Sequence, residues 1–226
     1  MAFSRELGLE NLPSGATLTR DLIGIGFALG GQGSTAPPLE KTLVAASREG
    51  ILLPDFRVLS LLCLWLERHS AQLNADLLTR LVRLTKEPRI RGFWAGVGGW
   101  LRKDRRFNHL RNLYRGPRIA LPDAGADFQI SRHGEDPRFK KTSLKVPANL
   151  LRRRDSDVMT PVELAKTNRH YHYRILIGPT FRADLWAHLE ADPALSPADL
   201  ARAASASFAS AWQVKRAYAL LHPALP

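Results

Sequence analysis

The chain has 226 residues, enough for one or two domains with a buried core. Apolar residues make up 45% and charged residues 24% of it, which excludes a chain that is disordered throughout. Cys63 is the single cysteine, so disulfide frameworks and multi-cysteine zinc sites are excluded. The net charge of +12 favours a polyanionic partner, nucleic acid first and an anionic membrane surface second.

Membrane and secretory segments are not expected. Residues 1–10 lack the apolar core of a secretory signal. The charge-free stretch 22–39 is broken by glycines and prolines, and the apolar run 58–66 is far shorter than the roughly 20 residues of a bilayer span. We therefore expect a cytoplasmic protein.

Residues 1–118 are predicted to form a helical domain. Helices are expected over 37–50, 54–73 and 74–86, and the middle one is apolar on nearly every side, which is typical of a core helix. The glycine-rich stretch 24–34 is interpreted as a loop between core elements, because it lacks the lysine and the glycine spacing of a phosphate-binding loop. Cys63 lies inside the core helix and is expected to be an inert buried thiol.

Most of the excess positive charge lies in the middle of the chain. Residues 80–118 carry 12 basic and 2 acidic groups, and one or two helices are predicted over 89–115. Within them Arg102, Arg105, Arg106 and His109 have the spacing of a single helix side. Residues 119–157 are rich in prolines and glycines without a helical period, which predicts an irregular basic connector.

This concentration of charge predicts a surface that contacts phosphates. The candidate phosphate-contacting residues are Arg102, Lys103, Arg105, Arg106, Lys140, Lys141, Arg152, Arg153 and Arg154.

A C-terminal domain is predicted over residues 158–226. Thr160 and Pro161 start a short helix, and the alternation in HYHYRILIG favours a strand or an extended passage. A helix over 179–191 follows, with its apolar residues on one side.

The last two predicted helices lie close together in the sequence. Ser196 and Pro197 open the first of them, and Ser207 caps the second after a short break at residues 205–207. The small residues Ala201, Ala204 and Ala211 allow two helices to approach closely over such a tight turn.

The layout of residues 180–221 resembles the helix-turn-helix family of DNA-binding domains. Residues at matching core positions are Leu200, Ala201, Ala204, Ala206, Ala211 and Val214. The resemblance implies a tri-helical domain whose last helix contacts base edges in the major groove through Ser207, Phe208, Ala209, Trp212, Gln213 and Arg216. The chain departs from the family at Ser205, where Gly is usual, and the residues after Leu221 offer no β-hairpin wing.

The C-terminal pattern also resembles DNA-binding proteins encoded in bacterial defence and toxin–antitoxin islands. We therefore expect a DNA-binding transcriptional regulator, or a DNA-engaging subunit of such a module. The expected partners are double-stranded DNA, a protein of the same module and a second copy of the chain. The alternatives are a non-enzymatic helical assembly protein and an RNA-directed enzyme.

Neither catalysis nor a cofactor is predicted. His170 and His172 would share one side of a strand, but no carboxylate or cysteine at ligand spacing accompanies them, so surface aromatic or base-stacking roles are favoured over a metal site. Glu135 with Asp136, and Asp155 with Asp157, could hold Mg²⁺ in principle, and solvated loops are favoured.

Overall fold

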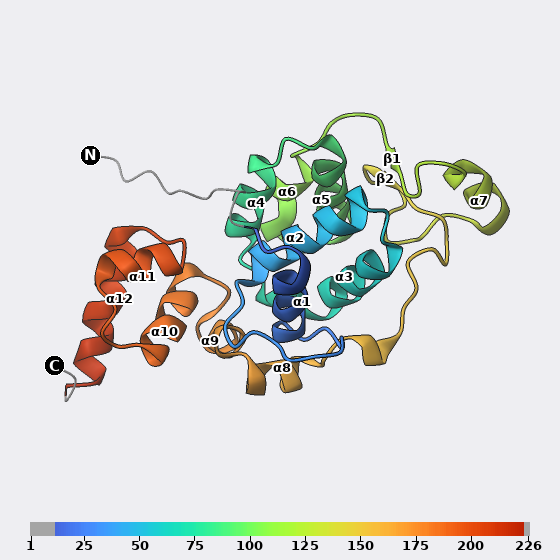
Figure 1. Ribbon diagram of the computed structural model, residues 1–226. Helices are drawn as coiled ribbons and strands as arrows, with labels where there is room; N and C mark the ends of the chain where they lie inside the picture. Colours follow the sequence, from blue (N-terminus) through green and yellow to red (C-terminus); the bar gives the residue numbers. More distant parts are fainter. Residues whose placement is uncertain (1–11, 224–226) are drawn as a thin grey trace. The chain divides into compact units, whose positions relative to one another are not determined.

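The computed structural model describes residues 12–223, and this part of the chain is mainly helical, which confirms the predicted mainly-α fold class. The chain divides into two compact units, which we call the larger unit (residues 12–159) and the smaller unit (residues 160–223). Figure 1 labels their helices and the short strand pair. Among the described residues, no helix is both long and apolar enough to cross a bilayer.

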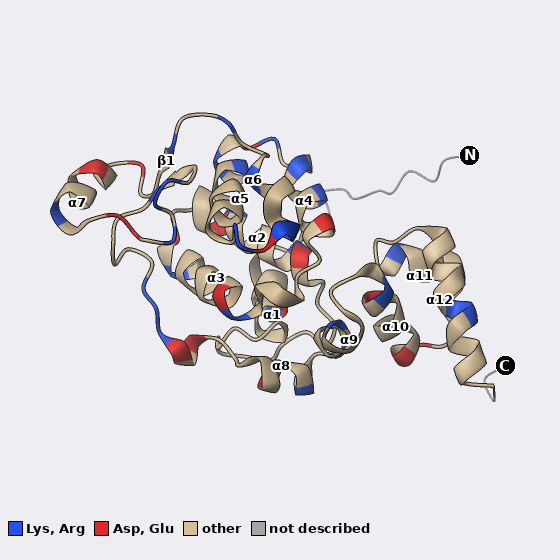
Figure 2. Cartoon of the chain, turned by 180° about the vertical axis from the view of Figure 1, so that it is seen from behind, with Lys and Arg blue, Asp and Glu red and all other residues tan. Residues whose placement is uncertain are grey.

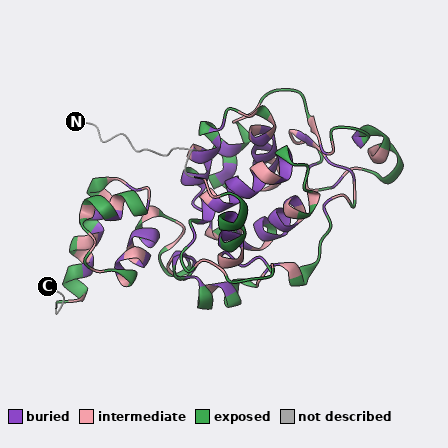
Figure 3. Ribbon diagram, in the orientation of Figure 1, coloured by how far each residue is buried: buried purple, intermediate pink, exposed green. Residues whose placement is uncertain are grey.

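The larger unit is built around α2 (Leu39–Leu52), which packs against α1 (Gly15–Gly24), α3 (Phe56–His69), α4 (Ala75–Leu84) and α5 (Pro88–Trp100). The short α6 (Asn108–Arg111) packs against α5 and α4, and α3, predicted to be the core helix, is buried over most of its length. The Asn74 side chain caps α4 by accepting a hydrogen bond from the Leu77 N–H at 3.0 Å, as predicted. Buried residues line the inner sides of these helices (Figure 3).

Two fully buried tryptophans join separate parts of the larger unit. The Trp65 indole N–H donates to the backbone carbonyl of Ile25 at 2.7 Å, and the Trp94 indole N–H donates to Ser47 Oγ at 2.9 Å. Each side chain therefore buries its ring without leaving its one polar atom unsatisfied.

The prediction of one helix side carrying Arg102 to His109 is wrong. The helix α5 ends at Trp100, and a turn, the short 3₁₀ helix Arg105–Phe107 and α6 follow it. The cause is local, because the Asp104 side chain accepts a hydrogen bond from the Arg106 N–H at 3.0 Å and starts a new turn there.

Residues 119–157, predicted to be a connector, lie within the larger unit. Two-residue strands β1 (Ile119–Ala120) and β2 (Leu144–Lys145) pair in parallel, and α7 (Ala126–His133) lies between them in the sequence. Leu121, Phe139, Leu144 and Val146 are buried. Their burial explains why the chain passes from one unit to the other near residue 159 rather than across this segment.

The smaller unit consists of five helices in its described part. They are α8 (Pro161–Thr167), α9 (Arg169–Ile177), α10 (Phe181–Ala191), α11 (Pro197–Ala203) and α12 (Phe208–Leu221). The predicted strand or extended passage over HYHYRILIG is wrong, because these residues form most of α9. Asn168 caps this helix by accepting from the Tyr171 N–H at 2.9 Å, and a buried ion pair, described below, binds it to α10.

Candidate nucleic-acid interface

The turn between α11 and α12 is closed by backbone and serine hydrogen bonds. The Ala206 N–H donates to the Ala201 carbonyl at 2.9 Å, so the turn folds back on the end of α11. Ser207 Oγ accepts from the Ser210 N–H at 3.1 Å and caps α12, as predicted. Ser205 has a φ of 53°, the left-handed conformation in which glycine is usual.

Replacing Ser205 with Gly should raise the stability of the smaller unit by roughly 0.5–1 kcal/mol. A left-handed conformation costs an L-residue about 1–2 kcal/mol, and the greater freedom of glycine in the unfolded chain offsets part of this gain. Ser205→Val should lower the stability, because a β-branched side chain tolerates this conformation poorly. Thermal melts of both variants test the left-handed conformation of Ser205. A Ser205→Val variant that is as stable as the wild-type protein would contradict that conformation.

Helices α10, α11 and α12 share one apolar core. It consists of Leu185 and Leu189 from α10, Leu200 and Ala204 from α11, Ala206 from the turn, and Ala211, Val214 and Tyr218 from α12. The predicted inward residues Leu200, Ala204, Ala211 and Val214 are therefore buried, whereas Ala201, also predicted to face inward, is only half-buried. At the last predicted position Tyr218 is buried and Ala217 is half-buried. The Trp186 ring meets the Tyr218 ring edge-on at 5.3 Å.

The opposite side of α12 carries most of the predicted base-contacting residues. Phe208, Ala209, Trp212, Gln213 and Arg216 are exposed. Ser207 is half-buried, and its hydroxyl is engaged in the cap and with Ser210 Oγ at 2.7 Å. The Arg216 guanidinium lies 5.6 Å from the centre of the Trp212 ring. We call the five exposed residues the α12 outer face.

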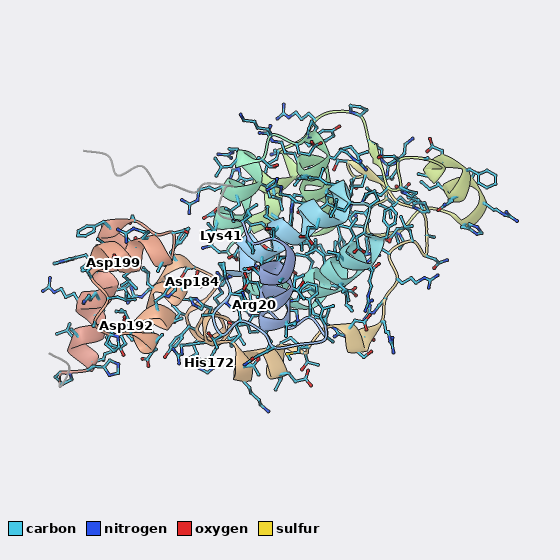
Figure 4. All side chains as sticks on the ribbon, viewed as in Figure 1. Arg20, Lys41, His172, Asp184, Asp192 and Asp199 are labelled. Atoms are coloured by element: carbon cyan, nitrogen blue, oxygen red, sulfur yellow. The ribbon has the colours of Figure 1, made fainter. Side chains whose placement is uncertain are left out.

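A buried ionic cluster joins α9 to α10. Asp184, labelled in Figure 4, accepts two hydrogen bonds from the Arg174 guanidinium, at 2.9 and 2.8 Å, and lies 3.3 Å from His170 Nδ1. Arg174 is only 2% exposed. Burial opposes ionisation of Asp184, but the charge of Arg174 and the hydrogen bonds from both partners outweigh it and hold the pKa of this carboxyl below its usual value.

The sequence predicts that His170 and His172 lie together at the surface, and this is wrong for His170. His170 is buried and its ring meets the His188 ring edge-on at 4.6 Å, while His172 is exposed, because α9 is a helix and separates the two. Burial lowers the pKa of His188 to about 4. In the described part of the chain no group of three or more His, Cys, Asp or Glu side chains could hold a metal ion.

The predicted phosphate-contacting residues separate into two groups. Arg106 is held by Asp104 at 2.6 Å, Arg153 by Glu67 at 2.6 Å, and Arg154 by Asp157 at 3.8 Å. The residues that are exposed and form no ion pair within the described part of the chain are Arg102, Lys103, Arg105, Lys140, Lys141 and Arg152. We call these six the basic surface.

Packing around α5 brings two segments of the basic surface together, the one after Trp100 and the one at Lys140 and Lys141. Gly98 and Gly99 leave no room for side chains, because an added Cβ would lie 2.7 Å from the Arg111 backbone N and 2.9 Å from Thr142 Cγ2. The Trp100 ring meets Phe139 at 5.9 Å. The end of α5 therefore packs against residues 139–142, which include Lys140 and Lys141.

The acidic pairs are neutralised by arginines. Asp136 is buried and pairs with Arg138 at 2.6 Å, and Glu135 pairs with Arg118. Asp155 pairs with Arg68 and Arg153 at 3.0 and 2.9 Å. These carboxylates hold the loops of the larger unit together, so the sequence-based interpretation as solvated loops is wrong for Asp136.

Two further sequence interpretations concern the larger unit. Cys63 is buried, and burial raises the pKa of its thiol to about 12, so it remains protonated. In the glycine-rich loop, Ser34 Oγ donates to Asp21 at 2.5 Å and the Ser34 N–H donates to the Arg20 carbonyl at 2.9 Å. The loop is therefore tied to α1, in keeping with a structural connection.

Comparison with family models, with curated proteins and with solved structures found no match to this chain.

Proposed function

We propose that the protein binds double-stranded DNA, with α12 in the major groove and the basic surface on phosphates. The observation that carries the proposal is the tight α11–α12 turn, which presents the α12 outer face to solvent while the other side of the helix is buried. A helix held in this way by two others can enter a groove that is about 12 Å wide.

Charge on α12 supports the same proposal. The helix carries Lys215 and Arg216 and no carboxylate (Figure 2). Lys215 Nζ donates to the Leu195 carbonyl, which leaves Arg216 as the exposed cation of the helix. Gln213 and Arg216 suit adenine and guanine edges respectively, because an amide and a guanidinium can each form two hydrogen bonds to those bases.

Replacing Arg216 with Ala should weaken specific DNA binding by about 1–3 kcal/mol and leave the melting temperature nearly unchanged. The side chain is exposed and stacks only on Trp212, so little stability depends on it. Competition binding with duplex DNA, measured on the same samples as a thermal melt, tests this. Arg169→Ala removes an exposed cation from α9 and is the matched control. Wild-type affinity of Arg216→Ala at every salt concentration would contradict the proposal.

Replacing Arg102, Arg105 and Lys140 together with Gln should weaken binding to all duplex sequences alike. Each lost phosphate contact should reduce the slope of log affinity against log salt by about 1. Arg106 is kept, because it donates to the Leu73 carbonyl at 3.2 Å and supports the fold.

The control removes the same charge elsewhere, with Arg20, Arg57 and Lys166 replaced by Gln. Equal salt slopes for the two triple variants would show that the basic surface contacts no phosphate.

A second candidate function is that of a helical assembly protein. It is favoured by the exposed apolar side chains of the smaller unit, which include Leu176, Leu220 and Leu221 besides Phe208 and Trp212. Light scattering over a range of protein concentrations, in the absence of DNA, tests for self-association.

A further inference from the structure

The α12 outer face is unusually apolar for the solvent side of a helix. Phe208 is 50% exposed and Trp212 is 48% exposed, and Ala209 lies beside them. The exposed side of a surface helix is ordinarily polar, and clustered exposed apolar groups mark binding sites. Only Gln213 and Arg216 supply polar groups to this face.

These side chains form two adjacent rows along the helix. Residues four apart are neighbours on a helix surface, so Phe208 lies next to Trp212, and Ala209 next to Gln213. Arg216 continues the first row and places its guanidinium over the Trp212 ring at 5.6 Å. The apolar groups are therefore at the amino-terminal part of α12, and the cation lies further along.

The major groove presents a single apolar group, the C5-methyl of thymine. The other groups at the base edges are hydrogen-bond donors and acceptors, which an aromatic or methyl side chain would leave unpaired. The absence of a carboxylate from α12 and the exposed Arg216 complement a polyanion. In a groove-bound helix the amino-terminal residues contact the base edges, and this is where Phe208 and Ala209 lie.

We propose that Phe208, Ala209 and Trp212 recognise thymine methyl groups, while Gln213 and Arg216 bond to neighbouring purine edges. The inference depends on the proposed function and specifies its substrate class: duplexes with thymines at the contacted positions. Removal of the methyl groups alone should then weaken binding, although every hydrogen-bonding group of the DNA is retained.

The experiment uses the full chain and a duplex enriched from a random-sequence pool by binding to it. That duplex is synthesised in two forms, one with thymine and one with deoxyuridine, which differ only in the methyl group. Each contacted methyl should account for about a fourfold loss of affinity in the deoxyuridine form. Phe208→Ser/Trp212→Ser should lose most of the preference for the thymine form, because only Ala209 of the three methyl-contacting residues remains. Leu221→Ser, a change at an exposed apolar residue at the end of α12, should keep the wild-type preference.

Equal binding of the two forms by the wild-type protein would overturn the inference. If Arg216→Ala still weakened binding in that case, the proposed function would stand without thymine recognition. If the wild-type protein bound no duplex at low salt, both thymine recognition and the proposed DNA binding would fail. Loss of self-association in Phe208→Ser/Trp212→Ser would then identify the α12 outer face as a protein contact. Circular dichroism checks the fold of the double variant, and if it does not fold the two-duplex comparison on wild type decides the inference.

Discussion

Replacing Asp184 with Asn should destabilise the smaller unit by about 3–5 kcal/mol, the usual cost of removing one member of a buried ion pair. Arg174 is almost fully buried and its guanidinium meets Asp184 through two hydrogen bonds. Asparagine keeps the size and part of the hydrogen bonding but removes the compensating charge. The loss should be concentrated in α9 and α10, where amide hydrogen exchange can measure it separately from the larger unit.

A double variant distinguishes the loss of charge balance between Arg174 and Asp184 from the loss of their packing contacts. Replacing Arg174 with Met and Asp184 with Leu removes both charges, and should be less destabilising than Asp184→Asn alone. Equal losses in the two variants, or a loss below about 1 kcal/mol for Asp184→Asn, would contradict a buried ion pair.

The same cluster predicts how stability depends on pH. The pKa of His188 is about 4 in the folded protein and lies below its ordinary value of 6.5, so the unfolded chain binds the proton more readily. Stability should fall as the pH decreases from about 6.5 to 4. The lowered pKa of Asp184 acts in the same direction at lower pH, because its contribution is lost as the carboxylate becomes protonated.

Replacing Trp65 with Ala should cost the larger unit about 3–5 kcal/mol, the usual range for truncation of a fully buried large aromatic. The change leaves a large cavity at the position of the Trp65 ring. It also removes the indole N–H that donates a hydrogen bond to the Ile25 carbonyl at 2.7 Å. Hydrogen exchange across 56–69 and a denaturant melt would both report the loss.

Trp212→Ala is the matched control, because it removes the same side chain from an exposed position on α12. It should change stability by well under 1 kcal/mol. A comparable loss in both variants, or a loss below about 1 kcal/mol for Trp65→Ala, would contradict the burial of α3 in the core of the larger unit.

The sequence by itself determined those parts of the protein that depend on local patterns. The apolar residues of α3 predicted its burial, Asn74, Ser196 and Ser207 predicted helix starts, and Leu200 and Val214 were predicted to be inward. These features follow from helical periodicity and from side chains that bond to nearby backbone N–H groups, so neighbours in the sequence suffice to determine them.

Only the tertiary structure decided the features that depend on partners far along the chain. The segment HYHYRILIG alternates like a strand, but α9 forms because Arg174 pairs with Asp184, ten residues away, in a buried site. Phe139 and Leu144 are buried on α5, which makes 119–157 part of the larger unit. The basic surface likewise emerged from side-chain pairing, because Arg153 matches Arg102 in residue type and differs from it in Glu67, which packing places beside it.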